Sequence, residues 1–562
     1  MSEDLLKQYA YKVDLEYISR TPKSRAMFEE SSRYISGGVT RETNWWKPYP
    51  VFIERGEGCY LYDIDGNEYV DYNGCYTASL LGNNPPEVIK AIQEAAPKLL
   101  SAGAPTEGVH QWAKILCDRY ASVDKVRFCC SGTEAVMYAC KAARAYTGKS
   151  KILRQSGSYH GTVPEMAVEM PYSQKGLAQS AGADVIVANL YNKAEIEQLV
   201  EQCKDDLAGI LLNGAWFSPA DDTLSFLRSI ADRYGVLLIM DEVLSFRLAM
   251  GGAQEYLGVD ADITAFGKFL GSGGLACGGF GGRDEIMSLF DFTKSEEPVH
   301  HGGTMVANPI TVAAGIAALQ KMTPELLNRL NTLGNRLKQG FTEALSERGI
   351  RSFVQAEGSL TLVGLGERTL DPRRAKVSPV VCEVMRLLGL SMLIKGHFTP
   401  ANGVSWAITA PMTEVEIDNT VVDFARTLDE IMPLLEVAAP ELILQNNVKP
   451  GRMNSSVGQL RDNMMSFPKY FLPEKAGDME AVYQFNITGD DGGEWYIVIK
   501  DGKCDISEGQ HEKPSCSLTM SAQTALAIED GDLSEAKALL TGKLGVKGKM
   551  KLVSKLGVIF NK

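Results

Sequence analysis

Residues 234–283 read YGVLLIMDEVLSFRLAMGGAQEYLGVDADITAFGKFLGSGGLACGGFGGR. The stretch opens with an apolar run at residues 236–240, whose length and branching predict a strand buried on both faces of a sheet. That run ends at Asp241 and Glu242, and a second short apolar segment leads to Lys268. The carboxyl ends of the strands in an open α/β sheet gather at one edge, where chemistry is placed. We therefore expect Asp241 and Lys268 to share a site, although an exposed lysine and a helix-capping aspartate fit the same spacing.

Two motifs of this stretch, DEVLSFR at 241–247 and GKFLGSGGLACGGFGGR at 267–283, resemble the pyridoxal 5′-phosphate (PLP) site of class III (fold-type I) aminotransferases. Within that class they are most similar to the glutamate-1-semialdehyde 2,1-aminomutase branch. The resemblance implies that Lys268 bonds the aldehyde of the cofactor and later moves a proton. It also implies that Asp241 keeps the pyridine nitrogen protonated, so that the ring accepts electrons, and that Val243 packs against the ring.

The resemblance implies an α/β fold in two parts over residues 1–435. The large domain, at about residues 80–310, is expected to hold a mainly parallel sheet. The small α+β domain is expected to come from residues 37–79 and 311–435. Residues 50–76 fit this division, because their apolar and polar positions alternate around Asp65 and Gly66, which predicts hairpin strands.

A candidate phosphate site lies at Ser131, Gly132 and Thr133, which follow a predicted strand and open a predicted helix. The free amides at a helix start bind anions. The sequence S-G-T-E is also a common helix cap, and that function alone would account for it. With Lys268 expected close by, the resemblance assigns these residues to the phosphate of the cofactor.

Two further motifs of the family are expected around the cofactor. SYHG at 158–161 implies that Tyr159 stacks on the cofactor ring, whereas we expect His160 to satisfy backbone groups. HGGT at 301–304 implies that Gly303 and Thr304 reach the phosphate bound by a neighbouring subunit. The resemblance thus predicts a homodimer with the active site at the subunit interface.

The residues that would select the substrate depart from the family pattern. Arg41 follows a GGV segment, after which the aminomutase branch carries an arginine that grips the substrate carboxylate; a surface ion pair is the alternative. Asn213 stands at a strand end where the family usually has Glu-Pro, and we take it as a second candidate substrate contact. No arginine follows His397, where several members place one, which disfavours a small dicarboxylate. The amino donor and acceptor stay open.

A second domain is predicted after a polar linker at residues 436–459. Residues 460–562 resemble the lipid-binding domain of the sterol carrier protein family, including its GKLGVKGKM segment at 542–550. Residues 483–487 and 495–499 are expected to pair as hairpin strands. The resemblance implies an α+β fold that encloses an apolar tunnel for a lipid or acyl ligand.

Composition narrows the function classes. The net charge of -13 argues against nucleic-acid or anionic-membrane surfaces, and no apolar run is long enough to span a bilayer. Eleven cysteines without paired CxxC spacing indicate reduced thiols in a cytoplasmic protein. No cysteine or histidine cluster has the spacing of a metal site, so we expect none.

Taken together, the sequence predicts a PLP-dependent aminotransferase that moves an amino group from an amino acid or another small-molecule donor to a carbonyl acceptor, including an apolar or long-chain one. One alternative within enzymes is an intramolecular aminomutase, because the glycine tract resembles that branch. Another is an amino acid epimerase, because the same lysine could return the proton to either face of the α-carbon. In another class, the chain is a lipid carrier on an inactive dimer scaffold. The intact set of Tyr159, Asp241, Lys268 and Thr304 argues against the scaffold.

Overall fold

The structure is a computed structural model. It describes residues 2–170, 174–366, 378–399 and 405–444, and, nearer the C-terminus, residues 464–465, 468, 471–477, 479–489, 492–529, 543–548, 552 and 555. The chain divides into two compact units, Met1–Leu444 and Gln445–Lys562.

The first unit begins with two helices and a small sheet. Helices α1 (Ser2–Arg20) and α2 (Pro22–Ser31) precede strands β1 (Ile53–Glu57), β2 (Tyr60–Asp63) and β3 (Glu68–Asp71). The three strands run as an antiparallel meander, and the short strand β13 (His397–Phe398) joins β3 in parallel. The Asp63 carboxylate accepts the backbone N–H groups of Asp65 and Asn67, which fixes the predicted turn between β2 and β3. The hairpin prediction is confirmed.

The centre of this unit is a seven-stranded sheet of order β4-β10-β9-β8-β7-β5-β6. Strands β5 to β9 pair in parallel, and β10 runs antiparallel to both of its neighbours. The expected mainly parallel sheet is therefore confirmed. The strands are β4 (Lys125–Cys129), β5 (Lys151–Gln155), β6 (Val185–Ala188), β7 (Leu207–Asn213), β8 (Leu237–Asp241), β9 (Ile263–Gly267) and β10 (Gly278–Gly282).

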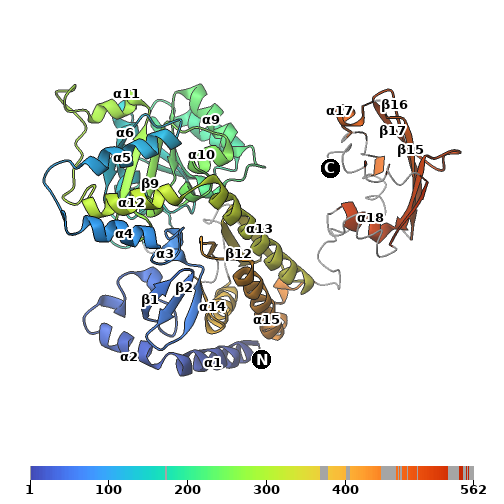
Figure 1. Ribbon diagram of the computed structural model, residues 1–562, viewed down its shortest axis with the longest axis horizontal. Helices are drawn as coiled ribbons and strands as arrows, with labels where there is room; N and C mark the ends of the chain where they lie inside the picture. The colour runs from blue at the N-terminus through green and yellow to red at the C-terminus, as the bar shows by residue number, and fades with distance from the viewer. Residues whose placement is uncertain are drawn as a thin grey trace. The chain divides into compact units, whose positions relative to one another are not determined.

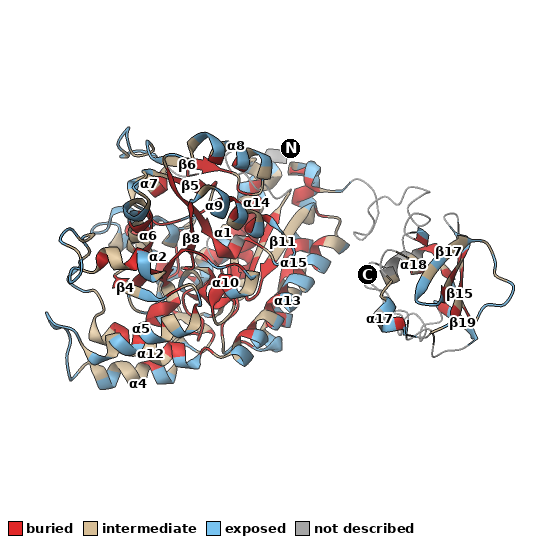
Figure 2. Cartoon of the chain, turned by 90° about the horizontal axis from the view of Figure 1, so that it is seen from above, coloured by how far each residue is buried: buried red, intermediate tan, exposed pale blue. Residues whose placement is uncertain are grey.

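Both faces of this sheet are covered, which explains the continuous apolar runs of its strands. In β8, Leu237 and Ile239 pack with helix α6 (Gly132–Thr147), while Leu238 and Met240 pack with α8 (Lys193–Cys203) and α9 (Thr223–Tyr234). Every residue of β8 and β9 is buried, and β5 and β8 are red in Figure 2. The predicted strand at residues 236–240 is confirmed, displaced by one residue.

The first unit also contains a three-stranded sheet. It contains β11 (Ser352–Glu357), β12 (Leu360–Leu365) and β14 (Ser405–Ala407), in that order. One face packs on α13, where Trp406 lies 5.0 Å from Phe341 between ring centroids. Ala356 and Thr361 are in register with Trp406 and share its face of the sheet. Because successive side chains of a strand point to opposite faces, Gln355 and Glu357 lie on the other face. The remaining longer helices are α4 (Pro86–Ala95), α5 (Glu107–Arg119), α12 (Pro309–Lys321), α13 (Pro324–Glu347), α14 (Pro379–Ile394) and α15 (Glu414–Ala438); shorter ones are α7 (Pro164–Ala167), α10 (Gly252–Leu257) and α11 (Asp284–Met287).

The second unit has its own sheet, of order β17-β16-β15-β18-β19. The predicted hairpin is confirmed as an antiparallel pair of β15 with β16, and the buried side chains of this unit form a separate core. The bounds are β15 (Ala481–Thr488), β16 (Gly493–Lys500), β17 (Lys503–Glu508), β18 (Cys516–Ser521), β19 (Leu544–Gly548), α17 (Pro473–Ala476) and α18 (Ala522–Glu529).

The predicted linker begins too early. Residues 436–444 belong to the first unit, because α15 continues to Ala438 and Leu442 is buried beyond it. Ile443 forms a β-bridge with Ile350, so backbone pairing also holds this segment to the first unit. The rest of the predicted linker, 445–459, lies outside the described residues, as do residues 542, 549 and 550 of the GKLGVKGKM segment. The division of the first unit into a large and a small domain stays a prediction.

Within the described part of the chain, no helix is both long and apolar enough to cross a bilayer.

Candidate active site

Lys268 lies directly after the buried strand β9, at the edge of the central sheet where β8 also ends. Its backbone φ is +49°, in the left-handed region that a non-glycine residue rarely adopts. Its Nζ donates a hydrogen bond to Thr77 Oγ1 at 3.4 Å. The strained backbone and this contact hold the amine over the carboxyl ends of the strands, as the sequence predicts.

The surroundings of Lys268 favour its neutral amine. Desolvation lowers its pKa to about 8, and the nearby Arg247 acts in the same direction, while Asp241 opposes both. A lysine with this pKa carries a much larger fraction of nucleophilic amine near neutral pH than an exposed one. Lysines of this kind are typical of sites that bond carbonyl groups.

Asp241 is the last residue of β8, and it is 2% exposed. Its Oδ2 accepts a hydrogen bond from His160 Nδ1 at 2.7 Å, and its Oδ1 accepts the backbone N–H of Val243 at 3.0 Å. The prediction that His160 satisfies backbone groups is wrong: it is a buried partner of the carboxylate. His160 follows β5, two strands away from β8, so only the strand order brings the pair together. His160 Nε2 has no hydrogen-bond partner among the described residues.

The start of α6 approaches the two strand ends closely. A Cβ atom placed on Gly132 would lie 2.9 Å from Val243 Cγ1, and one on Gly267 would lie 3.2 Å from both that atom and Gly132 Cα. Only glycine fits at such distances. The predicted phosphate site and the side chain predicted to pack on the ring are therefore neighbours.

The three residues of the phosphate motif lie at the N-terminus of α6. Ser131 Oγ accepts the backbone N–H of Glu134 at 3.1 Å, and the Glu134 carboxylate accepts the backbone N–H of Cys130 at 2.8 Å. Ser131 is thus the N-cap of α6, so the capping function considered for the sequence is present. The amides of the first turn, including those of Gly132 and Thr133, have no intrahelical acceptor and remain able to bind an anion.

A cavity of about 550 Å³ opens above Lys268. Tyr159 lines it and is 56% exposed, which leaves its ring free to stack on a bound group. One wall comes from the central sheet and the opposite wall from β11, β12 and β14. The lining residues are Thr43, Tyr72, Asn73, Tyr76, Thr77, Tyr159, Ala215, Leu244, Lys268, Gln355, Glu357, Leu360, Thr361, Leu362, Ser405 and Trp406.

A left-handed turn that the sequence analysis missed forms part of this cavity. Gly74, Cys75, Tyr76 and Thr77 have φ angles of +49°, +50°, +56° and +73°. Each non-glycine residue in this region costs on the order of 1 kcal/mol, so the surroundings must hold the turn in place. Asn73 Oδ1 accepts the Tyr76 N–H at 2.5 Å, and Tyr76 Oη donates to the Thr43 carbonyl at 2.5 Å. The turn presents Thr77 to the amine of Lys268.

Arg247, the last residue of the DEVLSFR motif, is the second residue that sequence reasoning overlooked. It is fully buried, and its guanidinium donates to the Thr77 carbonyl at 2.9 Å, to Ser359 Oγ at 3.0 Å and to the Ile408 carbonyl. Burial lowers its pKa to about 9. Arg247 thus ties the left-handed turn to the three-stranded sheet, and its place in the motif was the available signal.

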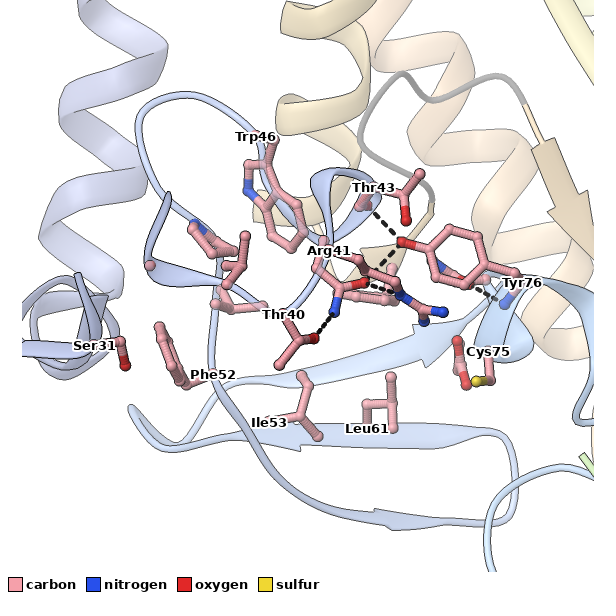
Figure 3. A pocket seen from close by; sticks show the side chains of 18 of the residues that line it. Ser31, Thr40, Arg41, Thr43, Trp46, Phe52, Ile53, Leu61, Cys75 and Tyr76 are labelled. Atoms are coloured by element: carbon pink, nitrogen blue, oxygen red, sulfur yellow. Dashed lines mark hydrogen bonds between the residues drawn. The ribbon is translucent and has the colours of Figure 1, made fainter. Parts of the chain in front are cut away.

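The predicted substrate residue Arg41 lines a neighbouring cavity of about 390 Å³. Figure 3 shows its guanidinium over the ring of Tyr76, 4.4 Å from the centroid, and its Nε donates to Asn44 Oδ1 at 2.9 Å. Tyr76 and Thr43 line both cavities, whereas Arg41 is not among the described residues that line the one above Lys268. The structure therefore does not bring Arg41 together with Lys268.

The other predicted residues lie further from the amine. Asn213 ends β7 and is 5% exposed; its Oδ1 accepts the backbone N–H of Ala215, which lines the cavity. Gly303 and Thr304 lie in an exposed segment before α12. Neither is among the described residues that line the cavity of their own chain.

Comparison with known families accounts for most of the chain. Residues 42–398 match the family described as aminotransferase class-III, and residues 472–561 match the SCP-2 sterol transfer family. Among curated proteins, the chain is 37% identical over 355 residues to glutamate-1-semialdehyde 2,1-aminomutase 2 of Bacillus licheniformis, which covers 60% of this chain and 81% of the relative.

Solved structures lead to the same class of proteins. An omega-transaminase from Sphaerobacter thermophilus is 36% identical, with a TM-score of 0.69, and the match covers 72% of this chain and 97% of the other. A transaminase with PLP bound is 32% identical, with a TM-score of 0.68, and the match covers 74% and 98% of the two chains. The similarity thus extends across the first unit and includes proteins named for both transamination and amino-group migration.

Proposed function

The chain belongs to the class III aminotransferases, which use pyridoxal 5′-phosphate, and we propose that Lys268 and Asp241 are its catalytic pair for moving an amino group from a donor to a carbonyl acceptor. The observation that carries the assignment is the position of Lys268. Its amine, with a pKa of about 8, reaches the cavity next to Thr77 and within the electrostatic influence of the buried Asp241.

The residues present fit the cofactor. The amides at the start of α6 suit its phosphate, Tyr159 and Val243 suit the two faces of its ring, and Asp241 suits the pyridine nitrogen. The fit is supported by two buried polar atoms near this place, Ser158 Oγ and His160 Nε2, that lack partners among the described residues. When bound, PLP supplies an electron sink for the pair left on the substrate carbon.

Each protein group then has one task. The neutral Lys268 amine would hold the cofactor through its aldehyde and would carry a proton between two positions of the substrate. Asp241, kept in place by His160, stabilises positive charge on the ring nitrogen. Thr77 and the left-handed turn orient the Lys268 amine.

The proposal is tested by absorbance of the PLP-loaded protein mixed with a panel of amines. We expect donors to convert the yellow form of the cofactor to a colourless one with release of one carbonyl product for each site. Lys268→Ala should reduce this rate by more than about 1,000-fold. The control Lys114→Ala, at an exposed position on α5, should retain the wild-type rate. A wild-type protein that stays colourless after PLP is added would refute the assignment.

A second candidate function is intramolecular amino transfer, favoured by the names of the curated relatives. Both reactions need the same lysine and differ in whether the first product leaves. Supplying glutamate-1-semialdehyde alone distinguishes them: an aminomutase converts it to the isomer with amino and carbonyl groups exchanged, whereas an aminotransferase needs a separate donor. Racemisation of an amino acid without net transfer would indicate the epimerase.

The proposal includes a homodimer in which Gly303 and Thr304 serve the partner subunit's phosphate site. Class III aminotransferases are typically dimeric. The exposure of Thr304 supports its use by another chain, since it does not line the cavity of its own. We also propose a cytoplasmic location, supported by eleven cysteines that are all free thiols.

For the second unit we propose binding of a lipid or acyl ligand that is delivered to, or received from, the first unit. The match to the SCP-2 sterol transfer family supports this, and a tethered carrier reaches millimolar effective concentration at an enzyme. A chain that ends at Leu444 tests it. Loss of kcat/KM for long-chain acceptors alone is expected; equal values on short and long acceptors for both chains would indicate that the second unit serves only assembly.

A further inference from the structure

The wall of the cavity opposite the central sheet carries a carboxylate that the proposed reaction does not use. Glu357, the last residue of β11, is 7% exposed and lines the same cavity as Lys268. Burying a carboxylate is unfavourable unless charge or hydrogen bonds compensate. Glu357 forms no ion pair among the described residues. Lys338, which is exposed on α13, acts on it only through the longer-range field.

Neutral donors hold this carboxylate in place. Tyr256 Oη donates to Glu357 Oε2 at 3.3 Å. Burial raises the pKa of Glu357, and the side chains of Gln355, Tyr256 and Ser218 oppose that rise. The hydrogen bond from Tyr256 leaves acceptor capacity on the carboxylate, which has about four lone-pair sites. Glu357 is thus oriented, and a cation beside it would offset the effect of burial on its pKa.

Gln355 supplies a second acceptor beside it. Its side-chain Oε1 is buried with no hydrogen-bond partner among the described residues. Gln355 and Glu357 alternate to the same face of β11, and both line the cavity. An orphaned buried acceptor next to an unpaired carboxylate is unfavourable in the empty protein, and it needs a ligand that only donates.

A protonated amine meets both needs, because an ammonium group has three donors, no acceptor and a positive charge. A hydroxyl group would satisfy the oxygen of Gln355 but not the charge of Glu357. A carboxylate on the substrate would be repelled. Among the described residues that line the cavity, Lys268 is the one basic side chain, and its task lies at the cofactor end.

We propose that Gln355 and Glu357 form a subsite for a second, distal ammonium group of the amino donor, so that the preferred donors are diamines or other bases with two amino groups. The inference rests on the proposed function, since it names the substrate class of that same site. One amine reacts at Lys268 while the other binds Glu357 at the opposite wall. Leu360 and Leu362, which pair with Glu357 and Gln355 across the two strands and line the same cavity, offer apolar contacts to the carbon chain.

The experiment compares three five-carbon donors in the PLP-loaded enzyme. They are pentylamine, the diamine cadaverine, and the amino acid 5-aminopentanoic acid, which has a carboxylate in place of the second amine. The rate of the donor half-reaction is followed by cofactor absorbance. We expect the wild type to prefer cadaverine over pentylamine by about 10- to 100-fold in kcat/KM, and the amino acid to be the poorest donor. Glu357→Gln should abolish the preference for cadaverine, improve the amino acid and leave pentylamine within about twofold.

Two further variants keep the result interpretable. Glu343→Gln, the same substitution at an exposed position of α13, should leave all three donors unchanged. Gln355→Met removes the orphaned acceptor but keeps the charge of Glu357, and it should lower the rate with cadaverine by a smaller factor. It also tests the subsite if Glu357→Gln does not fold.

Binding measurements distinguish a failure of the proposed subsite from a failure of the proposed function. Calorimetry on Lys268→Ala, alone and combined with Glu357→Gln, measures the affinities for cadaverine and pentylamine without turnover. A preference for cadaverine that depends on Glu357 supports the subsite even if no amine reacts in the wild type, a result that would overturn the function alone. Equal affinities and equal rates for the two amines in the wild type would overturn the subsite while the aminotransferase function stands.

Discussion

The two walls of the Lys268 cavity are built in different ways. The strand-end wall, where Leu244 and Lys268 line the cavity, lies where two parallel strands stop, and Asp241 and Val243 lie in the same motif-bearing stretch. The β11–β12 wall is the side of an antiparallel pair. Gln355 and Glu357 alternate toward the cavity on β11, and Leu360, Thr361 and Leu362 line it on β12.

The difference teaches how one chain separates chemistry from selection. At the strand-end wall each side chain is fixed by buried backbone and by a close partner, such as His160 for Asp241. Such rigidity suits groups that must meet reacting atoms at set distances. The β11–β12 wall offers side chains in a row, which can change without disturbing the sheet. Substitutions at the first wall should therefore affect all donors, and those at the second only some.

The largest effect that would sharpen this comparison is expected from Asp241→Asn. The substitution keeps the shape but removes the charge that keeps the ring nitrogen protonated, so proton transfer should slow by about 100- to 10,000-fold. PLP should still bind. Single-turnover rates for monoamines and diamines should fall by the same factor; a loss confined to one donor class would contradict the separation of the walls.

His160 should have a smaller and more revealing effect, because it acts through Asp241. His160→Ala leaves that buried carboxylate without its charge-assisted hydrogen bond and should lower the half-reaction rate by about 10- to 100-fold. His160→Asn places a donor where Nδ1 lies and should restore most of the loss. KM should stay near the wild-type value in both variants. His110→Ala, at an exposed position of α5, serves as the control. Equal rates for the Ala and Asn variants would argue against the hydrogen bond as the cause.

The pKa of Lys268 predicts an effect of about tenfold with pH. Its folded value, about 8, is below the ordinary lysine value, so the neutral amine is present at a lower pH. The rate at which the cofactor-free protein combines with PLP should rise about fivefold from pH 7 to 8 and level off above about pH 9. Stopped-flow absorbance measures this rate. Lysine acetylated at its α-amino group, which keeps the side-chain amine free, is the reference amine. Parallel pH profiles for the protein and the reference would show that the site does not lower the pKa.

The smallest effect on the rate is expected from Thr304, which belongs to neither wall of the cavity. If Thr304 acts in the partner's site, a mixed dimer of Lys268→Ala and Thr304→Ala chains has one site with both defects and one intact site. Such mixed dimers, purified with two affinity tags, should show about half of the native rate for each dimer. If each site is built within one chain, every site carries a defect, and the rate should stay at the level of the single variants.

The local patterns of the sequence were sufficient for individual strands, while the mainly parallel sheet was expected from the resemblance to a known family. The apolar run before Asp241 predicted a doubly covered strand, because a strand buried on both faces needs apolar residues at every position. The alternation around Asp65 predicted the meander, and residues 241–268 placed a carboxylate and a lysine at neighbouring strand ends. These features depend on residues near one another in the chain, so period and motif are enough to find them.

Tertiary structure alone decided which distant groups complete the site. His160 reaches Asp241 because β5 and β8 flank β7, and Arg247 donates to the Thr77 carbonyl across 170 residues of chain. The left-handed turn at residues 74–77 has no glycine pattern to announce it, since three of its residues are held against their own preference. Glu357 reads as an ordinary polar residue at a strand end. Its burial opposite Lys268 depends on how two sheets meet, and no local pattern encodes that.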